Sequence, residues 1–139
     1  MDLRQLADVL HREKCSCVVW NRETLTLCHQ RGVKDLYTIL SESPDLLRDA
    51  SIADKIIGKG AAALMILGGV RAVYADIISE PALELFKNAG ITVQYEKAVP
   101  NIINRAGTGV CPVESLCSDC TTAEDCLPLI SKFIENINK

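Results

Sequence analysis

The sequence predicts an α/β fold, a three-layer α/β/α sandwich around a mixed sheet of four or five strands. Three observations support this prediction: an early β-rich hairpin pattern, an alternation of strands and helices after residue 70, and a composition with 48% hydrophobic but only 4% aromatic residues. A chain of 139 residues with this composition fits one domain over residues 1–139, and aliphatic side chains are expected to fill its core.

The first 44 residues predict a helix, a hairpin and a second helix. Apolar residues recur at helical spacing between Leu3 and Leu10. The runs at 15–20 and 24–29 are rich in β-forming residues and flank a polar turn, so they are expected to pair as an antiparallel hairpin. Apolar residues from Val33 to Leu40 then share one side of a short helix, which ends near Pro44.

The middle of the chain, SIADKIIGKGAAALMILGG at residues 51–69, is interpreted as one helix. Ser51 is its N-cap, Asp54 lies in its first turn, and the two glycines at 68 and 69 close it. From Ala61 onward this segment is apolar nearly all round, which predicts burial against the sheet.

The remaining elements alternate. Residues 72–78 predict a strand, the next helix has Ser79 as its cap and Gly90 as its stop, and residues 91–96 predict another strand. Strands joined by a helix pair in parallel through right-handed crossovers. A last helix is expected from about residue 122 to residue 136.

One stretch, VYADIISEPALELF at residues 73–86, resembles the cytidine-deaminase-like fold, in which a strand runs into Glu-Pro-Cys-x-x-Cys. Glu80 and Pro81 match this motif, whereas Ala82 and Leu85 stand where the two zinc thiolates would be. The helix containing Gly58-Lys59-Gly60 also lacks the zinc ligand and the glutamate of such enzymes. The resemblance therefore implies the fold, no zinc at the deaminase position and no zinc-dependent deaminase activity.

The whole chain resembles an uncharacterised conserved family of bacteria and archaea within the cytidine-deaminase-like superfamily, a family that lacks the zinc motif. Four segments carry this resemblance: residues 53–64, 68–86, 89–105 and 107–112. The resemblance implies a fold and supplies no activity.

Two features predict a site for a small anionic ligand, such as a nucleotide-type metabolite. Lys59, between two glycines, is expected at the mouth of a pocket; the alternative is that these glycines serve helix packing. In NRAGTGVCP, residues 104–112, backbone amides beside Asn104, Arg105 and Thr108 suit a phosphate or a carboxylate. The alternative there is a tight turn capped by Asn104 and Thr108.

Asp76 completes the predicted ligand site, because open α/β sheets bind ligands beyond the carboxyl ends of their strands. A buried carboxylate needs a partner, and Lys59 or Arg105 is expected to supply it. Ser79 and Glu114 are expected at the same rim.

The segment at residues 111–126 is rich in cysteine, with Cys111, Cys117, Cys120 and Cys126. Four thiolates suffice for zinc or an iron–sulfur cluster. Alternatively, Cys111 is a nucleophile or redox thiol while the other three form a disulfide or stay free, or all four are inert. Cys15 and Cys17 alternate in a strand and should face opposite sides; with Cys28 they are interpreted as packing residues.

Charge and hydropathy exclude two classes of partner. A net charge of −3 argues against a nucleic-acid footprint, and the longest nearly uncharged run, residues 60–70, is too short to cross a membrane. The N-terminal segment lacks the pattern of a signal peptide, so the cytoplasm is the expected location. The apolar stripe of the last helix is expected mostly in the core, with contact to a second copy of the chain as an alternative. His11 and His29 are interpreted as structural or solvated.

Overall fold

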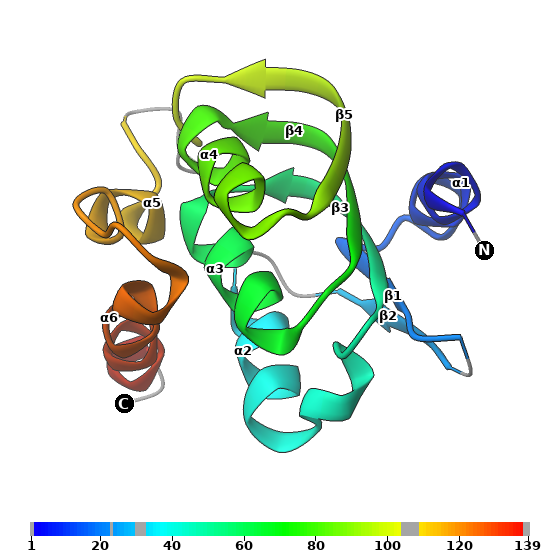
Figure 1. The fold of residues 1–139 in the computed structure, drawn as a ribbon, viewed down its shortest axis with the longest axis horizontal. Helices are drawn as coiled ribbons and strands as arrows, with labels where there is room; N and C mark the ends of the chain where they lie inside the picture. Colours follow the sequence, from blue (N-terminus) through cyan, green and yellow to red (C-terminus); the bar gives the residue numbers. More distant parts are fainter. Residues whose placement is uncertain (1, 23, 30–32, 104–108, 138–139) are drawn as a thin grey trace.

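A computed structural model describes residues 2–22, 24–29, 33–103 and 109–137, and its helices and strands follow the predicted order with one strand and two short helical segments added (Figure 1). The helices are α1 (Leu3–Glu13), α2 (Lys34–Glu42), the 3-10 turn η1 (Pro44–Leu46), α3 (Lys59–Gly68), α4 (Glu80–Ala89), α5 (Pro112–Leu116) and α6 (Ala123–Ile137). The strands are β1 (Cys17–Trp20), β2 (Leu25–Cys28), β3 (Ser51–Ile57), β4 (Ala72–Ser79) and β5 (Thr92–Val99).

The five strands form one mixed sheet in the order β2-β1-β3-β4-β5. β1 pairs antiparallel with both β2 and β3, whereas β3, β4 and β5 are parallel. The predicted hairpin, the parallel pairing of the later strands and the mixed α/β sheet are therefore confirmed. β2 and β5 are the edges, and β3 is the central strand.

The interpretation of residues 51–69 as one helix was wrong. Residues 51–57 form β3, and α3 begins only at Lys59, after Gly58 in an extended conformation. The first four residues of β3 are all buried, so this strand lacks the regular alternation of buried and exposed residues that marks a half-buried strand, and a short segment without that alternation is easily mistaken for helix. Pairing with β1 on one side and β4 on the other therefore decides the conformation of this segment.

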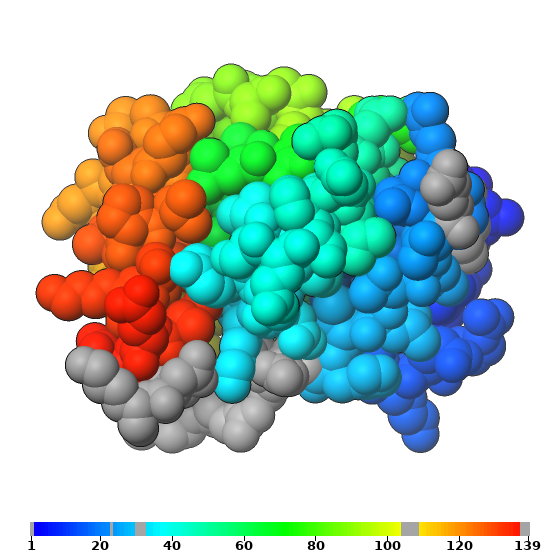
Figure 2. Space-filling model, turned by 90° about the horizontal axis from the view of Figure 1, so that it is seen from below, coloured from blue at the N-terminus to red at the C-terminus, as the bar shows by residue number. Residues whose placement is uncertain are grey.

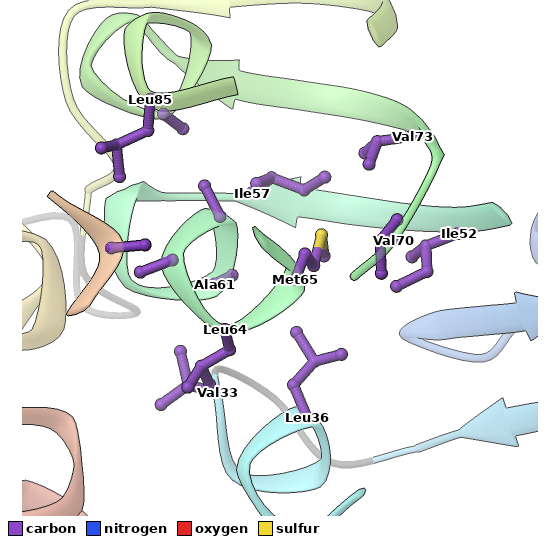
Figure 3. Close-up of a cluster of buried hydrophobic side chains, with 14 of the residues drawn as sticks. Val33, Leu36, Ile52, Ile57, Ala61, Leu64, Met65, Val70, Val73 and Leu85 are labelled. Carbon is purple, nitrogen blue, oxygen red and sulfur yellow. The ribbon is translucent and has the colours of Figure 1, made fainter. Parts of the chain in front are cut away.

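Helices cover both faces of the sheet. On one face, α1 packs over Val18, Ala53 and Tyr74 and forms a small separate core. On the other face, α2, α3 and α4 form the main core, and Figure 3 shows α3 between the sheet, Leu85 of α4 and the segment with Val33 and Leu36. The predicted burial of α3 is confirmed, since every residue from Lys59 to Met65 is buried.

Cap residues mark the beginning of α4 and the ends of α3 and α4 at the positions that the sequence predicted. The Ser79 hydroxyl accepts a hydrogen bond from the Ala82 N–H at the start of α4. Gly69 and Gly90 end α3 and α4 with φ angles of 84° and 72°, a left-handed conformation that glycine adopts without strain.

The C-terminal helices close the end of the sheet to which the parallel strands point, as the arrowheads in Figure 1 show. Ile130 and Ile134 of α6 are buried in the main core, as predicted for most of this stripe, whereas Leu129 is exposed. Tyr37 of α2 and Ser131 of α6 share a hydrogen bond of 2.7 Å between their hydroxyl groups. Figure 2 shows α2 (cyan) on the surface between α6 (orange to red) and the N-terminal hairpin (blue).

None of the helices in the described ranges combines the length and the apolar content needed to cross a membrane.

Gly60 sets how closely α3 approaches α5, and replacing it with alanine tests this contact. A Cβ at Gly60 would lie 2.3 Å from Cγ1 of Val113, which is itself buried, so one of the two helices must shift. We expect Gly60→Ala to lower the free energy of unfolding by about 1–3 kcal/mol in urea denaturation, despite the better helix propensity of alanine. Gly109→Ala is the control, because a Cβ there meets nothing within 4 Å. Equal stability of the two variants would contradict this packing.

Candidate functional site

A buried carboxylate, that of Glu114 in α5, lies at the carboxyl ends of β3 and β4, where α3 and α4 begin. Its side chain is only 2% exposed. Oε1 accepts hydrogen bonds from the Lys59 N–H at 2.8 Å and from the Ser79 hydroxyl at 2.9 Å, and Oε2 accepts from the Ile102 N–H. These three donors with the starts of α3 and α4 form what we call the carboxylate cradle. Groups at the start of a helix favour negative charge.

Lys59 is a buried residue of this site, and backbone oxygens bind its ammonium. Nζ donates to the backbone oxygens of Ser118, at 3.2 Å, and of Cys120. The backbone of Lys59 therefore binds the beginning of α5 through Glu114, while its side chain binds the turn that follows α5. The sequence placed Lys59, Ser79 and Glu114 at one rim, and the structure brings these three together.

Asp76 does not lie beside Glu114. Lys59 was one of its two expected partners, and this expectation was wrong, because Nζ of Lys59 binds backbone oxygens. The other expected partner, Arg105, lies outside the described residues.

Oδ1 of Asp76 accepts a hydrogen bond from the Tyr74 hydroxyl at 2.6 Å and lies 2.7 Å from Nε2 of His11. Successive side chains of a strand face opposite sides. Since Ala75 faces the main core, Asp76 faces α1. Burial and the Asp76 carboxylate raise the pKa of Tyr74.

The three residues of the predicted anion loop, Asn104, Arg105 and Thr108, lie outside the described residues. The flanks of this loop are defined: Ile103 pairs with Val110 in an isolated antiparallel bridge, and the Cys111 N–H donates to the Ile102 oxygen at 2.8 Å. Because the Ile102 N–H binds Glu114, the two flanks of this loop meet beside the carboxylate cradle.

Of the four C-terminal cysteines, Cys117, Cys120 and Cys126 interact with one another. All seven cysteines lie in the described ranges and none is in a disulfide. The Cys126 thiol is within hydrogen-bonding reach of Cys117 and Cys120; this contact lowers the pKa of Cys117 and raises that of Cys126, and burial raises the pKa of Cys120 to about 11. Cys111 is the residue that precedes α5. In the part of the chain that the structure describes, no group of three or more His, Cys, Asp or Glu side chains is placed to hold a metal ion.

A second polar cluster, which the sequence did not predict, crosses the antiparallel side of the sheet. Cys17 of β1 lies directly opposite Cys28 of β2 on one side and opposite Asp54 of β3 on the other. We call these three residues the thiol row. Cys15 belongs to the core under α1 and Cys17 to the main core, so their predicted opposite orientation is confirmed.

The thiol row lines a cavity of about 220 Å³ between β1, β2, β3 and α2. Lys14, His29, Asp35 and Lys55 also line it. Burial raises the pKa of Asp54 to about 7, although the Ile56 N–H donates to its Oδ1 at 3.2 Å. The hydrogen bond between the two thiols raises the pKa of Cys17 and lowers that of Cys28.

One sequence signal could have revealed the thiol row. If residues 51–57 are taken as a strand beside the hairpin, Asp54 becomes an acidic residue in the middle of a central strand, which demands a polar neighbour. The helix interpretation placed Asp54 in a first turn, where a carboxylate is ordinary.

Comparisons with known proteins agree with this architecture. The sequence profile of the family described as TM1506, domain of unknown function (DUF1893), matches residues 5–134. Among solved structures, a DUF1893 family protein (TM1506) from Thermotoga maritima superposes with a TM-score of 0.85 at 22% sequence identity. The match covers 94% of this chain and 88% of that chain, and at this identity it shows the fold alone. No curated protein matches the chain.

The raised pKa of Asp54 makes stability depend on pH in a defined direction. The folded state holds the proton up to about pH 7, whereas the ordinary value is 3.8, so the free energy of unfolding should fall as pH rises between these values. A shift of this size corresponds to roughly 4 kcal/mol. We expect Asp54→Asn to flatten this part of the stability curve, measured by urea denaturation between pH 4 and pH 8. An unchanged slope in the variant would contradict the assignment to Asp54.

Proposed function

We propose that this chain, which belongs to the DUF1893 family, is a small-ligand-binding domain with a cytidine-deaminase-like fold and without the zinc of that fold. The ligand is a small anion such as a nucleotide-type metabolite. One observation carries the proposal: three hydrogen-bond donors and the starts of two helices converge on one carboxylate, that of Glu114.

The position of the carboxylate cradle supports the deaminase-like assignment. In zinc deaminases, the ligands come from two motifs, one containing a His or Cys and a Glu and the other containing Pro-Cys-x-x-Cys. Here the corresponding helices, α3 and α4, begin beside the cradle. Ala82 and Leu85, which stand in place of the two thiolates, are buried apolar residues. Metal-activated hydrolysis needs ligands and a proton-transferring carboxyl group at that point, so this site is suited to binding and not to deamination.

The carboxylate of Glu114 stands where an anionic ligand would bind. A ligand carboxylate or phosphate can use the same N–H and hydroxyl donors once α5 moves away. Asn104, Arg105 and Thr108 follow Ile102 closely in the chain and would add a guanidinium and further donors to that ligand. Lys59 contributes its backbone N–H, whereas the sequence predicted that its side chain would lie at the mouth of the pocket.

An anion-rescue experiment tests the cradle. We expect Glu114→Ala to lose about 3 kcal/mol of stability, because buried donors are left without an acceptor. Sodium acetate should restore part of the loss and raise the melting temperature of the variant. Glu84→Ala, which removes an exposed carboxylate from α4, is the matched control and should respond no more than the wild type.

The same measurement on the wild-type protein tests the ligand. At a hundred times its dissociation constant, a bound ligand adds about 2.7 kcal/mol to the free energy of unfolding. We expect at least one nucleotide or related anionic metabolite to raise the melting temperature, and Arg105→Ala to weaken that effect.

The acetate experiment has a contradicting outcome. If sodium chloride at equal ionic strength stabilises Glu114→Ala as well as acetate does, the donors do not form an anion site and the proposal fails.

The alternative function, thiol-dependent redox or metal-binding chemistry at the C-terminal cysteines, is favoured by one observation. The thiols of Cys117, Cys120 and Cys126 interact with one another beside Lys59. Metal analysis of protein purified without oxygen, combined with thiol counting, separates this function from ligand binding. Stoichiometric zinc or iron would favour the alternative.

A further inference from the structure

The thiol row has the arrangement that thiol–disulfide exchange requires. Cys17 and Cys28 are directly opposite each other on antiparallel strands. Cα atoms in such pairs lie about 4.5–5.5 Å apart, within the range of roughly 4.4–6.8 Å that disulfides span. The two sulfurs can therefore be joined without moving either strand.

Asp54 supplies a proton acceptor on the other side of Cys17. Its carboxyl group lies opposite Cys17 in the register and interacts with that thiol. The side chain is 8% exposed, and the protein holds it in the sheet without an ion pair to a lysine or arginine among the described residues. A buried carboxyl group that titrates near neutral pH suits general acid–base catalysis.

The cavity beside the row limits what can react there. Its volume of about 220 Å³ has room for roughly seven waters, at ~30 Å³ each in the liquid. That space has room for a low-molecular-weight disulfide, whereas Cys17 and Cys28, each 4% exposed, lie too deep for the surface of a folded protein to reach their sulfurs. Two lysines, Lys14 and Lys55, and two acidic residues, Asp35 and Asp54, line the cavity, so its charge does not exclude a neutral disulfide.

We propose that Cys17, Cys28 and Asp54 form a dithiol–disulfide exchange site whose substrate is a low-molecular-weight disulfide. This site is separate from the carboxylate cradle and does not depend on the proposed function. Cys17 and Cys28 are each 4% exposed, and both line the cavity. Cys28 is the attacking cysteine, because its hydrogen bond with the Cys17 thiol lowers its pKa, and Cys17 is the resolving cysteine.

The reaction balances with one small disulfide, RSSR. The Cys28 thiol loses its proton to solvent, and the thiolate attacks one sulfur of RSSR. A mixed disulfide between Cys28 and one R–S group forms, and the other leaves as a thiolate that takes up a proton. Asp54 then accepts the proton of Cys17 as that sulfur attacks the Cys28 sulfur. The second R–S group leaves and is protonated, so two protein thiols are oxidised and RSSR is reduced to two RSH. Excess small thiol reverses both steps.

Several charged groups share the cavity or its neighbourhood and will shape the pH dependence. Besides the two thiols, the cavity is lined by Lys14, His29, Asp35 and Lys55, and Asp76 of β4 acts on Asp54 from the opposite face of the sheet.

The test uses the full-length reduced protein and bis(2-hydroxyethyl) disulfide as the probe. After alkylation of the remaining thiols, peptide mapping by mass spectrometry should find the first cross-link between Cys17 and Cys28. This measurement needs no variant. A first cross-link among Cys117, Cys120 and Cys126, or a first adduct at Cys111, would overturn the proposal.

Variants then assign the steps. Cys17→Ser should accumulate a mixed disulfide at Cys28, whereas Cys28→Ser should form neither the adduct nor the cross-link at this site. Cys111→Ser, the control, should react like the wild type. Asp54→Asn should slow closure of the disulfide about a hundredfold at pH 7 and remove the rise in rate with pH near neutrality, an effect that a purely structural role would not produce. An Asp54→Asn rate and pH profile equal to the wild type would exclude Asp54 from the reaction.

Discussion

The buried carboxylate of Glu114 is the interaction on which the arrangement of the C-terminal half depends. A carboxylate that is 2% exposed is tolerated only if hydrogen bonds replace its water, and here the donors come from α3, from the end of β4 and from the segment after β5. Three segments far apart in sequence are thereby fixed around α5. Lys59 reinforces the same contact through the oxygens of Ser118 and Cys120, so that α6 is positioned to cover α3.

The central strand β3 connects the two polar clusters of the molecule. Asp54, near its middle, belongs to the thiol row on the antiparallel side of the sheet, and Gly58 and Lys59, just beyond its end, belong to the carboxylate cradle. The two clusters differ in chemistry: the cradle offers donors to an anion, whereas the row holds two thiols beside a carboxyl group that titrates near neutral pH. Each cluster can therefore be tested without disturbing the other.

Local signals in the sequence predicted most of the fold, and long-range pairing explains what they missed. Ser79 and Gly90 mark the ends of α4 because capping is a local property, and the hairpin followed from two β-rich runs beside a polar turn. Residues 51–57 carry no such mark, since their strand conformation comes from neighbours on both sides. For the same reason Asp54 was placed on a helix and Cys17 and Cys28 were interpreted as packing residues. The partners of Asp76 were also missed. A place near the carboxyl end of a strand does not determine which face of the sheet the side chain occupies, and Asp76 lies on the face that α1 covers.

Hydrogen exchange at the Lys59 amide tests the central claim most directly. The first N–H groups of a helix have no partner within the helix and exchange quickly unless something else binds them. If Glu114 accepts the Lys59 N–H as described, this amide should exchange slowly in the wild-type protein and much faster in Glu114→Ala, which has no side-chain acceptor, while amides within β3 keep their protection. Fast exchange at Lys59 in the wild type, or equal protection in the variant, would contradict a buried carboxylate as the constraint that organises this half of the molecule.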